Sequence, residues 1–214
     1  MSLVPILYES PHLLVINKPG GIVVERDPHG YPSIEEWALD YLAATVKKPY
    51  AGIVHRLDRP VSGVLLIAKK KSVLRELNRQ FEQRSVEKIY LAVVEQVPDE
   101  TFGTLEHWIS KDQKEKRAIV RPGPAAGAFL CSLSYELRKT LPHGRALLEV
   151  RPHTGKFHQI RVQLAAIGCP IVGDEKYGAT SVFRPDAIAL HAWKLGFTDP
   201  VSGEQLWVEA PADF

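Results

Sequence analysis

Residues 53–64 read IVHRLDRPVSGV, a short polar stretch that separates two hydrophobic ends. Its aspartate, Asp58, lies between two arginines, and the proline and Ser-Gly pair that follow favour a sharp turn of the backbone. A polar turn between two buried elements would account for this pattern. A carboxylate held in place for chemistry would account for it as well, so Asp58 is the first candidate for a functional residue.

The composition is that of a globular protein with a sizeable core. Of the 214 residues, 45% are apolar and 24% are charged, which fits one domain or at most two small ones. No stretch approaches the ~20 apolar residues that a membrane helix needs, and the N-terminus lacks the basic and apolar regions of a signal peptide. The isolated Cys131 and Cys169 fit a reducing cytoplasm and predict neither a disulfide nor a metal site.

The net charge is only +2, but its distribution along the chain is uneven. Residues 69–88 contain seven Lys or Arg against three Glu, and residues 138–161 contain six against one, with three histidines besides. Acidic stretches at 95–106 and after Val162 balance them. Separated blocks of this kind fit a protein that binds a polyanion on a positive face. Solvated helix faces would give the same pattern, so charge alone leaves both readings open.

Short strands and few helices follow from the apolar periodicity. Ser33, with Glu36 at the capping-box position, predicts a helix through Leu42. A second helix is expected in KSVLRELNRQFEQR, and a third in FHQIRVQLAAIG, ending at Gly168. Short strands separated by Ser-Pro and Pro-Gly-Gly turns are expected in ILYESPHLLVINKPGGIVV. Further strands are expected in GVLLIAKK, KIYLAVVEQV, TLEHWI, CSLSYELRK and RALLEVRP, and two more, joined by a turn, in IALHAWKLGFTDPVSGEQLWVEA.

The order of these elements predicts the fold class. Strands outnumber helices and often follow one another directly, which favours an α+β fold with a mixed, mostly antiparallel sheet and flanking helices over a doubly wound α/β fold. Residues 121–129, RPGPAAGAF, are expected to form a long loop or a disordered insertion. No repeat or obvious linker divides the chain, so residues 1–214 are expected to form a single domain.

The sequence lacks the standard cofactor motifs, namely a phosphate-binding P-loop, a Gly-x-Gly-x-x-Gly turn, His-Glu-x-x-His and Gly-x-Ser-x-Gly. Asp58 is therefore the main candidate, and it needs a counter-charge to stay ionised in a pocket that excludes water. Arg161 falls at the edge of the apolar face of the third expected helix. It must find a buried partner or extend to solvent. A pair between Arg161 and Asp58 would satisfy both residues.

Tyr90 and Lys88 would share one face of the strand KIYLAVV. A tyrosine beside a lysine suits a stacked base with a nearby phosphate. A half-buried strand tyrosine without such a role fits the pattern too.

Several motifs resemble those of one enzyme family, the RluA branch of the RNA pseudouridine synthases. HRLDRPVSG resembles the family's H-R-L-D-x-x-[ST]-S-G signature, and KIYLA resembles its K-x-Y-x-A segment. TGKFHQIRVQ is similar to T-G-R-T-H-Q-I-R-x-H/Q, and PIVGDEKYG to P-I-x-G-D-x-x-Y-G. The segments ILYESPHLLVINKP and LHAWKLGFTDPVSGE are similar to the motifs at the start and near the end of the family's catalytic domain. The motifs occur in the family's order across almost the whole chain.

The resemblance implies a reaction and roles for individual residues. The reaction is the isomerisation of uridine to pseudouridine within RNA, without a metal or organic cofactor. Asp58 matches the catalytic aspartate, Tyr90 the tyrosine that packs against the target base, and Arg161 the arginine that pairs with the aspartate. Arg56 matches an arginine that in some relatives enters the RNA where the uridine has swung out. The remaining residues expected to contact RNA are His55, Lys88, Lys156 and His158.

The resemblance also implies a mixed sheet with a central RNA-binding cleft and a structured substrate, a stem-loop of ribosomal or transfer RNA. The small S4-type RNA-binding domain that precedes the catalytic domain in many relatives is expected to be absent, and the protein is expected to be a cytoplasmic monomer. Four positions depart from the motifs: Val61 replaces Thr or Ser, Lys156 replaces Arg, Phe157 replaces Thr, and Asp199 stands where His is common. Lys156 keeps a positive charge but loses the two-pronged geometry of arginine.

Two other functions are compatible with the sequence. An RNA chaperone could keep the fold and lack turnover, although Asp58, Tyr90 and Arg161 are all present. A carboxylate-based glycosidase would need a second carboxylate opposite Asp58. No such partner is apparent from the sequence.

Overall fold

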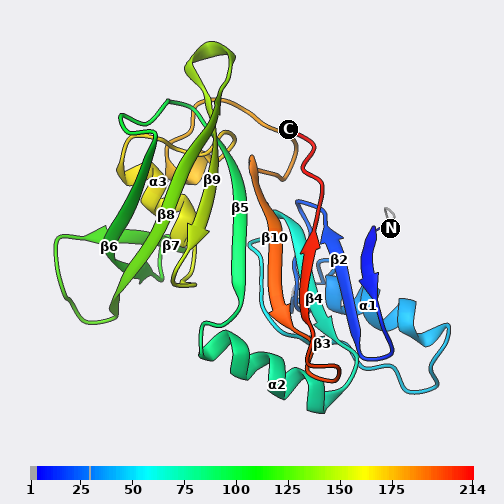
Figure 1. Ribbon diagram of the computed structural model, residues 1–214. Helices are drawn as coiled ribbons and strands as arrows, with labels where there is room; N and C mark the ends of the chain where they lie inside the picture. Colours follow the sequence, from blue (N-terminus) through cyan, green and yellow to red (C-terminus); the bar gives the residue numbers. More distant parts are fainter. Residues whose placement is uncertain (1–3, 29) are drawn as a thin grey trace. The chain divides into compact units, whose positions relative to one another are not determined.

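The computed structural model describes residues 4–28 and 30–214, and the chain forms two compact units (Figure 1). The first unit comprises Met1–Lys88 and His191–Asp213, and the second comprises Ile89–Leu190 with Phe214. In the part of the chain that the structure describes, no helix is long and apolar enough to cross a membrane.

The first unit is a mixed sheet with two helices. Its strands are β1 (Ile6–Glu9), β2 (Leu13–Lys18), β3 (Gly52–Ile53), β4 (Ser62–Ala68), β10 (Leu190–Thr198) and β11 (Gln205–Glu209). They follow the order β1-β2-β4-β10-β11, with β3 on β4, and among the strand pairs of the described residues in this unit only β4–β10 is parallel. The helices are α1 (Ile34–Ala43) and α2 (Lys71–Glu82). Ser33 caps α1 by accepting a hydrogen bond from the Glu36 N–H, as predicted.

Alternation along β2 and β4 builds the core of this unit. Leu13 and Val15 of β2 and Leu66 of β4 point to the same side, where they pack with Leu77 of α2 and Phe197 of β10. The continuous apolar run of β4 is fully buried, as expected for a central strand with neighbours on both edges.

The parallel β4–β10 pair brings two backbones unusually close at Gly63. This residue has φ 117°, and a Cβ there would lie 2.2 Å from the Ala192 carbonyl oxygen. Only glycine fits this position without moving β10. Next to it, the Ser62 Oγ lies 2.8 Å from Nδ1 of the buried His191, whose Nε2 lies 3.1 Å from the Ala210 carbonyl. A carbonyl only accepts, so Nε2 carries the proton and Ser62 donates to Nδ1. The Ser-Gly pair of the opening motif therefore joins β4 to β10.

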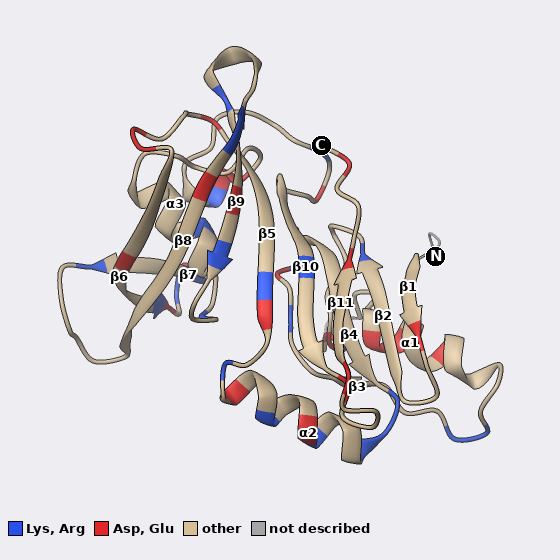
Figure 2. Cartoon of the chain, viewed as in Figure 1, with Lys and Arg blue, Asp and Glu red and all other residues tan. Residues whose placement is uncertain are grey.

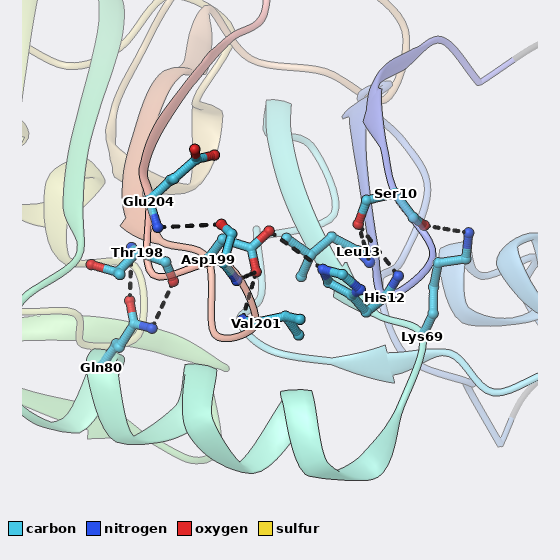
Figure 3. Close-up of polar contacts among 10 residues, drawn as sticks. Ser10, His12, Leu13, Lys69, Gln80, Thr198, Asp199, Val201 and Glu204 are labelled. Atoms are coloured by element: carbon cyan, nitrogen blue, oxygen red, sulfur yellow. Dashed lines mark hydrogen bonds and ion pairs between the residues drawn. The ribbon is translucent and has the colours of Figure 1, made fainter.

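Polar side chains fix the turn between β10 and β11 (Figure 3). The Gln80 side chain of α2 both donates to the Thr198 carbonyl (2.8 Å) and accepts from the Thr198 N–H (3.0 Å). The buried Asp199 accepts from the Val201 N–H at 2.8 Å, and its other oxygen lies 3.4 Å from His12 Nε2. The aspartate that departs from the motif at position 199 thus holds the turn in shape.

The second unit is an antiparallel sheet with one α-helix. Its strands are β5 (Glu87–Val94), β6 (Phe102–Asp112), β7 (Arg117–Arg121), β8 (Ala128–Thr140) and β9 (Ala146–Pro152), in the order β5-β9-β8-β6-β7. The helix α3 (Gln159–Ala166) is accompanied by two 3₁₀ turns, η1 (Pro142–Gly144) and η2 (Glu175–Tyr177). Val162 of α3 packs on Ile109, Ala118 and Cys131 of the sheet.

The expected α+β class with mixed, mostly antiparallel sheets is confirmed, with two local differences. The loop expected at residues 121–129 spans only residues 122–127, because Arg121 ends β7 and residues 128–129 begin β8, and β7 itself was not predicted. The third helix was expected to start at Phe157, but it starts at Gln159 because His158 has a left-handed backbone (φ 52°). Its end agrees with expectation, since Gly168 follows it with φ 75°.

Candidate active site

The loop that carries Asp58 is fixed to the rest of the first unit by its backbone. The Asp58 carbonyl accepts from the Val61 N–H at 3.0 Å, which closes the turn. The Arg59 carbonyl accepts from the Gly21 N–H at 2.8 Å, and Arg59 Nε donates back to the Gly21 carbonyl at 3.0 Å. Leu57 and Val61 on either side are buried. The half-buried Asp58 is therefore presented from a rigid turn.

A buried lysine lies beneath this turn. Lys18 is fully buried, and its Nζ donates to the carbonyls of Pro19 (2.8 Å), Ile22 (2.8 Å) and Arg59 (3.2 Å). Burial lowers the pKa of Lys18 to about 7, against the opposing attraction of the Asp58 carboxylate. Lys18 was not among the predicted site residues, although a lysine at the end of the apolar run LLVIN was a signal. Lys18 joins the start of the chain to the residue that follows Asp58.

His55 anchors the other end of the turn. Its Nε2 accepts a hydrogen bond from the Leu66 N–H at 3.1 Å, so this nitrogen carries no proton, and the ring stacks on Phe81 at 5.1 Å. Burial lowers the pKa of His55 to about 3, and nearby Lys88 adds to the effect. The contacts observed for His55 are thus structural, and its expected RNA contact stays a prediction.

The other cations expected to contact RNA from this unit differ in exposure. Arg56 is exposed and pairs with Glu25 at 2.9 Å, a surface contact that costs little to break. Lys88 is partly buried, and burial together with Arg84 lowers its pKa. Arg56 is therefore the cation in this loop that can reorient toward a ligand most easily.

Arg161 is buried and has a carboxylate partner in its own unit. Its Nε and Nη2 donate to the two oxygens of Asp174 at 2.7 and 2.8 Å, in a two-pronged geometry. The guanidinium also lies 5.1 Å from the ring centre of Tyr177. The alternative in which Arg161 extends to solvent is wrong. Asp174 was missed because its distance from Arg161 along the chain, across a loop, matches no helical or strand spacing. The pair between Arg161 and Asp58 remains a prediction.

His158 links this arginine cluster to the neighbouring loop. Its Nδ1 lies 2.8 Å from the Tyr177 hydroxyl, which also accepts a hydrogen bond from the Ala118 N–H of β7. Burial lowers the pKa of His158 to about 3, and Arg161 contributes in the same direction. Lys156 and Phe157, just before it, are exposed. The half-buried Tyr90 lies on β5, directly across from Val150 of β9.

Acidic neighbours partly neutralise the two basic stretches. Lys69 pairs with Glu9, and Arg79 pairs with Glu76 on α2, where basic and acidic bands alternate (Figure 2). In the second stretch, Arg138 and Arg151 both contact the buried Glu149. In residues 4–28 and 30–214, no group of three or more His, Cys, Asp or Glu side chains is placed to hold a metal ion.

Comparison with known proteins gives a consistent result. A family model described as RNA pseudouridylate synthase matches residues 12–166. The ribosomal large subunit pseudouridine synthase D of Nitrosomonas europaea is 37% identical over 96% of the chain and 61% of its own length. The synthase C of Escherichia coli is 34% identical over 97% of the chain and 66% of its own length. The chain thus spans about two thirds of the length of these curated relatives.

A solved structure supports the fold. Human RNA pseudouridylate synthase domain containing 1 is 26% identical and superposes with a TM-score of 0.81, over 99% of this chain and 84% of that chain.

Proposed function

Because the chain belongs to the RNA pseudouridylate synthase family, we propose that it isomerises specific uridines to pseudouridine in structured RNA. The observation that carries the proposal is Asp58, a carboxylate on a turn fixed by backbone hydrogen bonds within a family motif. We propose that both compact units act together as one catalytic domain over residues 1–214. The family match includes segments of each unit.

The reaction breaks the bond between the ribose C1′ and N1 of uracil and forms a bond between C1′ and C5. The base rotates between the two steps, N1 gains a proton and C5 loses one, so the reaction consumes no co-substrate. Asp58 acts as a carboxylate, either by attacking the sugar or base or by removing a ribose proton. In this scheme Arg161 keeps Asp58 ionised and oriented, and Asp174 holds Arg161 in place.

The target uridine must leave its base stack before it reaches Asp58. Extruding a base costs a few kcal/mol, and least where it is unpaired. We propose that Tyr90 packs against the extruded base and that Arg56 occupies the space it leaves in the RNA. The exposed Arg56–Glu25 pair costs at most ~1 kcal/mol to open, so this movement is inexpensive.

We propose ribosomal RNA of the large subunit as the substrate class, in preference to transfer RNA. The named relatives in Nitrosomonas europaea and Escherichia coli are ribosomal large subunit pseudouridine synthases. The protein would work in the cytoplasm, as a monomer, where its free cysteines Cys131 and Cys169 stay reduced.

The direct test is a pseudouridine map of total RNA from cells with the wild-type gene, with Asp58→Asn, and without the gene. We expect the same one or few sites to vanish in both altered strains, because the amide can neither attack nor accept a proton. On purified RNA the rate should fall at least ~10²-fold. Sites that persist with Asp58→Asn but vanish without the gene would show that another group does the chemistry. If no site changes in either strain, an RNA-binding protein without turnover becomes the better account.

A further inference from the structure

Two exposed phenylalanines and two lysines alternate in space at one end of the second unit. Lys156 Nζ lies 4.0 Å from the centre of the Phe129 ring, and Lys111 Nζ lies 4.8 Å from the centre of the Phe157 ring. Phe129 is 53% exposed and Phe157 is 40% exposed. Since Lys156 and Phe157 are neighbours in the chain, the order is Phe129, Lys156, Phe157, Lys111, which we call the aromatic–lysine ladder.

The ladder lies on the same face of the sheet as Tyr90. Phe129 and Tyr135 are an even number of residues apart on β8, so their side chains share a face. Tyr135 pairs with Val150 of β9, and Val150 pairs with Tyr90 of β5, and directly opposed residues also share a face. Phe129 is about 20 Å from Tyr135 along β8, at ~3.4 Å per residue. Cys131 and Leu133, which lie between them on this face, are buried, and Val162 of α3 packs on Cys131, so the ladder forms the exposed edge of the face that α3 covers.

The loop that presents Phe157 is rigid. Gln159 Oε1 accepts from the Lys156 N–H (3.1 Å) and from the Thr154 hydroxyl (2.7 Å), while its Nε2 donates to the Ser132 carbonyl (3.0 Å). His158, in its left-handed conformation, stacks on Phe157 with ring centres 3.7 Å apart. Left-handed backbone at a non-glycine residue is costly and persists where the surroundings enforce it. Phe157 is thus held outward before any ligand arrives.

The same loop contacts the cluster around Arg161. His158 reaches the Tyr177 hydroxyl, and the Arg161 guanidinium lies over the Tyr177 ring. A nucleotide stacked on Phe157 would therefore be separated from Arg161 by only two side chains, His158 and Tyr177.

We propose that the aromatic–lysine ladder binds unpaired nucleotides that flank the target uridine, with bases stacked on Phe129 and Phe157 and phosphates contacted by Lys111 and Lys156. This inference rests on the proposed function and names a part of the substrate. Alternating aromatic and basic side chains match the alternating bases and phosphates of a single strand. A stacked base contributes more than an exposed cation–π contact. Each ammonium can therefore leave its ring for a phosphate as a base takes its place.

The ladder is a property of this chain and not of the motif alone, because Phe157 stands where the family motif has threonine. Exposed apolar surface alone would also suit a protein partner. Alternation with lysine and the contacts through His158 and Tyr177 to Arg161 favour RNA.

The test measures binding of a fluorescein-labelled single-stranded 12-residue oligoribonucleotide, and of a blunt RNA duplex of the same sequence, by fluorescence anisotropy. All variants are made in the full chain with Asp58→Asn, which prevents turnover during the measurement. Phe129→Ala and Phe157→Ala should each weaken single-strand binding roughly 5- to 150-fold and leave duplex binding unchanged. Phe157→Tyr should restore the affinity. Lys111→Met and Lys156→Met should each reduce the slope of log affinity against log salt by about 0.7.

Phe102→Ala is the matched control, because Phe102 is 74% exposed and alternation places it on the opposite face of the same sheet from Tyr135. The proposal would be overturned if Phe129→Ala and Phe157→Ala weakened single-strand binding no more than Phe102→Ala does, or if they weakened duplex binding to the same extent. Absence of any single-strand binding would overturn it too. With Asp58 intact, the Phe variants should raise KM for pseudouridine formation more than they lower kcat. If the wild-type protein forms no pseudouridine while the binding losses remain, the proposed function fails and the ladder stands.

Discussion

Lys18 shows how one buried charge can hold the turn that carries Asp58. Three backbone carbonyls, including that of Arg59 next to Asp58, accept hydrogen bonds from its ammonium. A buried carbonyl without a donor costs about 1–3 kcal/mol, so this cation offsets a large penalty even though its own burial is unfavourable. Because these acceptors come from two separate segments, Lys18 ties residues 18–22 to the Asp58 turn.

Lys18→Met should destabilise the protein in a way that depends on pH. The folded pKa of Lys18 is about 7, below its ordinary 10.5, so the unfolded chain binds more protons between these values and wild-type stability rises with pH there. The variant lacks this rise. Its deficit in the free energy of unfolding should therefore grow by about 3 kcal/mol between about pH 7 and about pH 9.5.

Urea denaturation at both pH values measures this difference. Lys47→Met, at an exposed lysine beyond α1, serves as the control and should leave the pH dependence unchanged. A deficit for Lys18→Met that is constant with pH would show that Lys18 has an ordinary pKa in the folded protein.

At the scale of elements, α3 depends on the buried pair between Arg161 and Asp174. Asp174→Asn removes the charge that compensates Arg161 and should lower the free energy of unfolding by about 3–5 kcal/mol. The double variant Arg161→Met, Asp174→Leu should recover most of this loss, since apolar side chains of similar volume often replace a buried pair at little cost. It should nevertheless form no pseudouridine, because the arginine proposed to orient Asp58 is gone.

Chemical denaturation and assays of pseudouridine formation are carried out on the wild type, on Asp174→Asn and on the double variant. Together they separate the contribution of Arg161 to stability from its proposed role in orienting Asp58. Full isomerase activity in the double variant would remove Arg161 from the mechanism. A double variant as unstable as Asp174→Asn would show instead that this site cannot accept an apolar pair.

The elements themselves were largely predictable, whereas partners distant in sequence were not. Helical spacing located α2, and the capping residue Ser33 located the start of α1, because both signals are local. The start of α3 could not be placed, because the left-handed backbone of His158 depends on contacts with Tyr177 and Phe157 from outside the helix. β7 escaped prediction because the Pro- and Gly-rich stretch that follows it dominated the local pattern.

The candidate site shows the same difference between residues that local motifs predict and partners that lie far away in the sequence. Asp58, Tyr90 and Arg161 were predicted from motifs, and the structure adds the contacts that hold the Asp58 turn and Arg161 in place. His55 was expected to contact RNA. In the structure its ring accepts a hydrogen bond from the Leu66 N–H of β4, and no rule of residue spacing predicts this contact between a loop and a strand. Asp174 was part of a quoted motif without a role, since only the folded loop brings it to Arg161.

At the scale of the whole molecule, a net charge of +2 conceals local cationic surface. Many basic side chains form ion pairs with carboxylates, as in the Arg79–Glu76 and Arg151–Glu149 pairs. Such paired cations contribute little to the attraction of a polyanion. The ammonium groups of Lys111 and Lys156 lie instead over phenylalanine rings, and these contacts do not neutralise their positive charge. Affinity for RNA should therefore follow a small set of cations and not the overall count of Lys and Arg.

Binding of single-stranded RNA should accordingly depend moderately on salt. If Arg56, Lys88, Lys111 and Lys156 each contact a phosphate, log affinity should fall against log salt with a slope of about −3, at ~0.7 per contact. Anisotropy titrations between about 50 and about 200 mM salt give the slope. Lys47→Met should not change it, whereas Arg56→Met should make it shallower by about 0.7. A slope shallower than about −1 would mean that phosphates contribute little, and that stacking on Tyr90, Phe129 and Phe157 supplies most of the affinity.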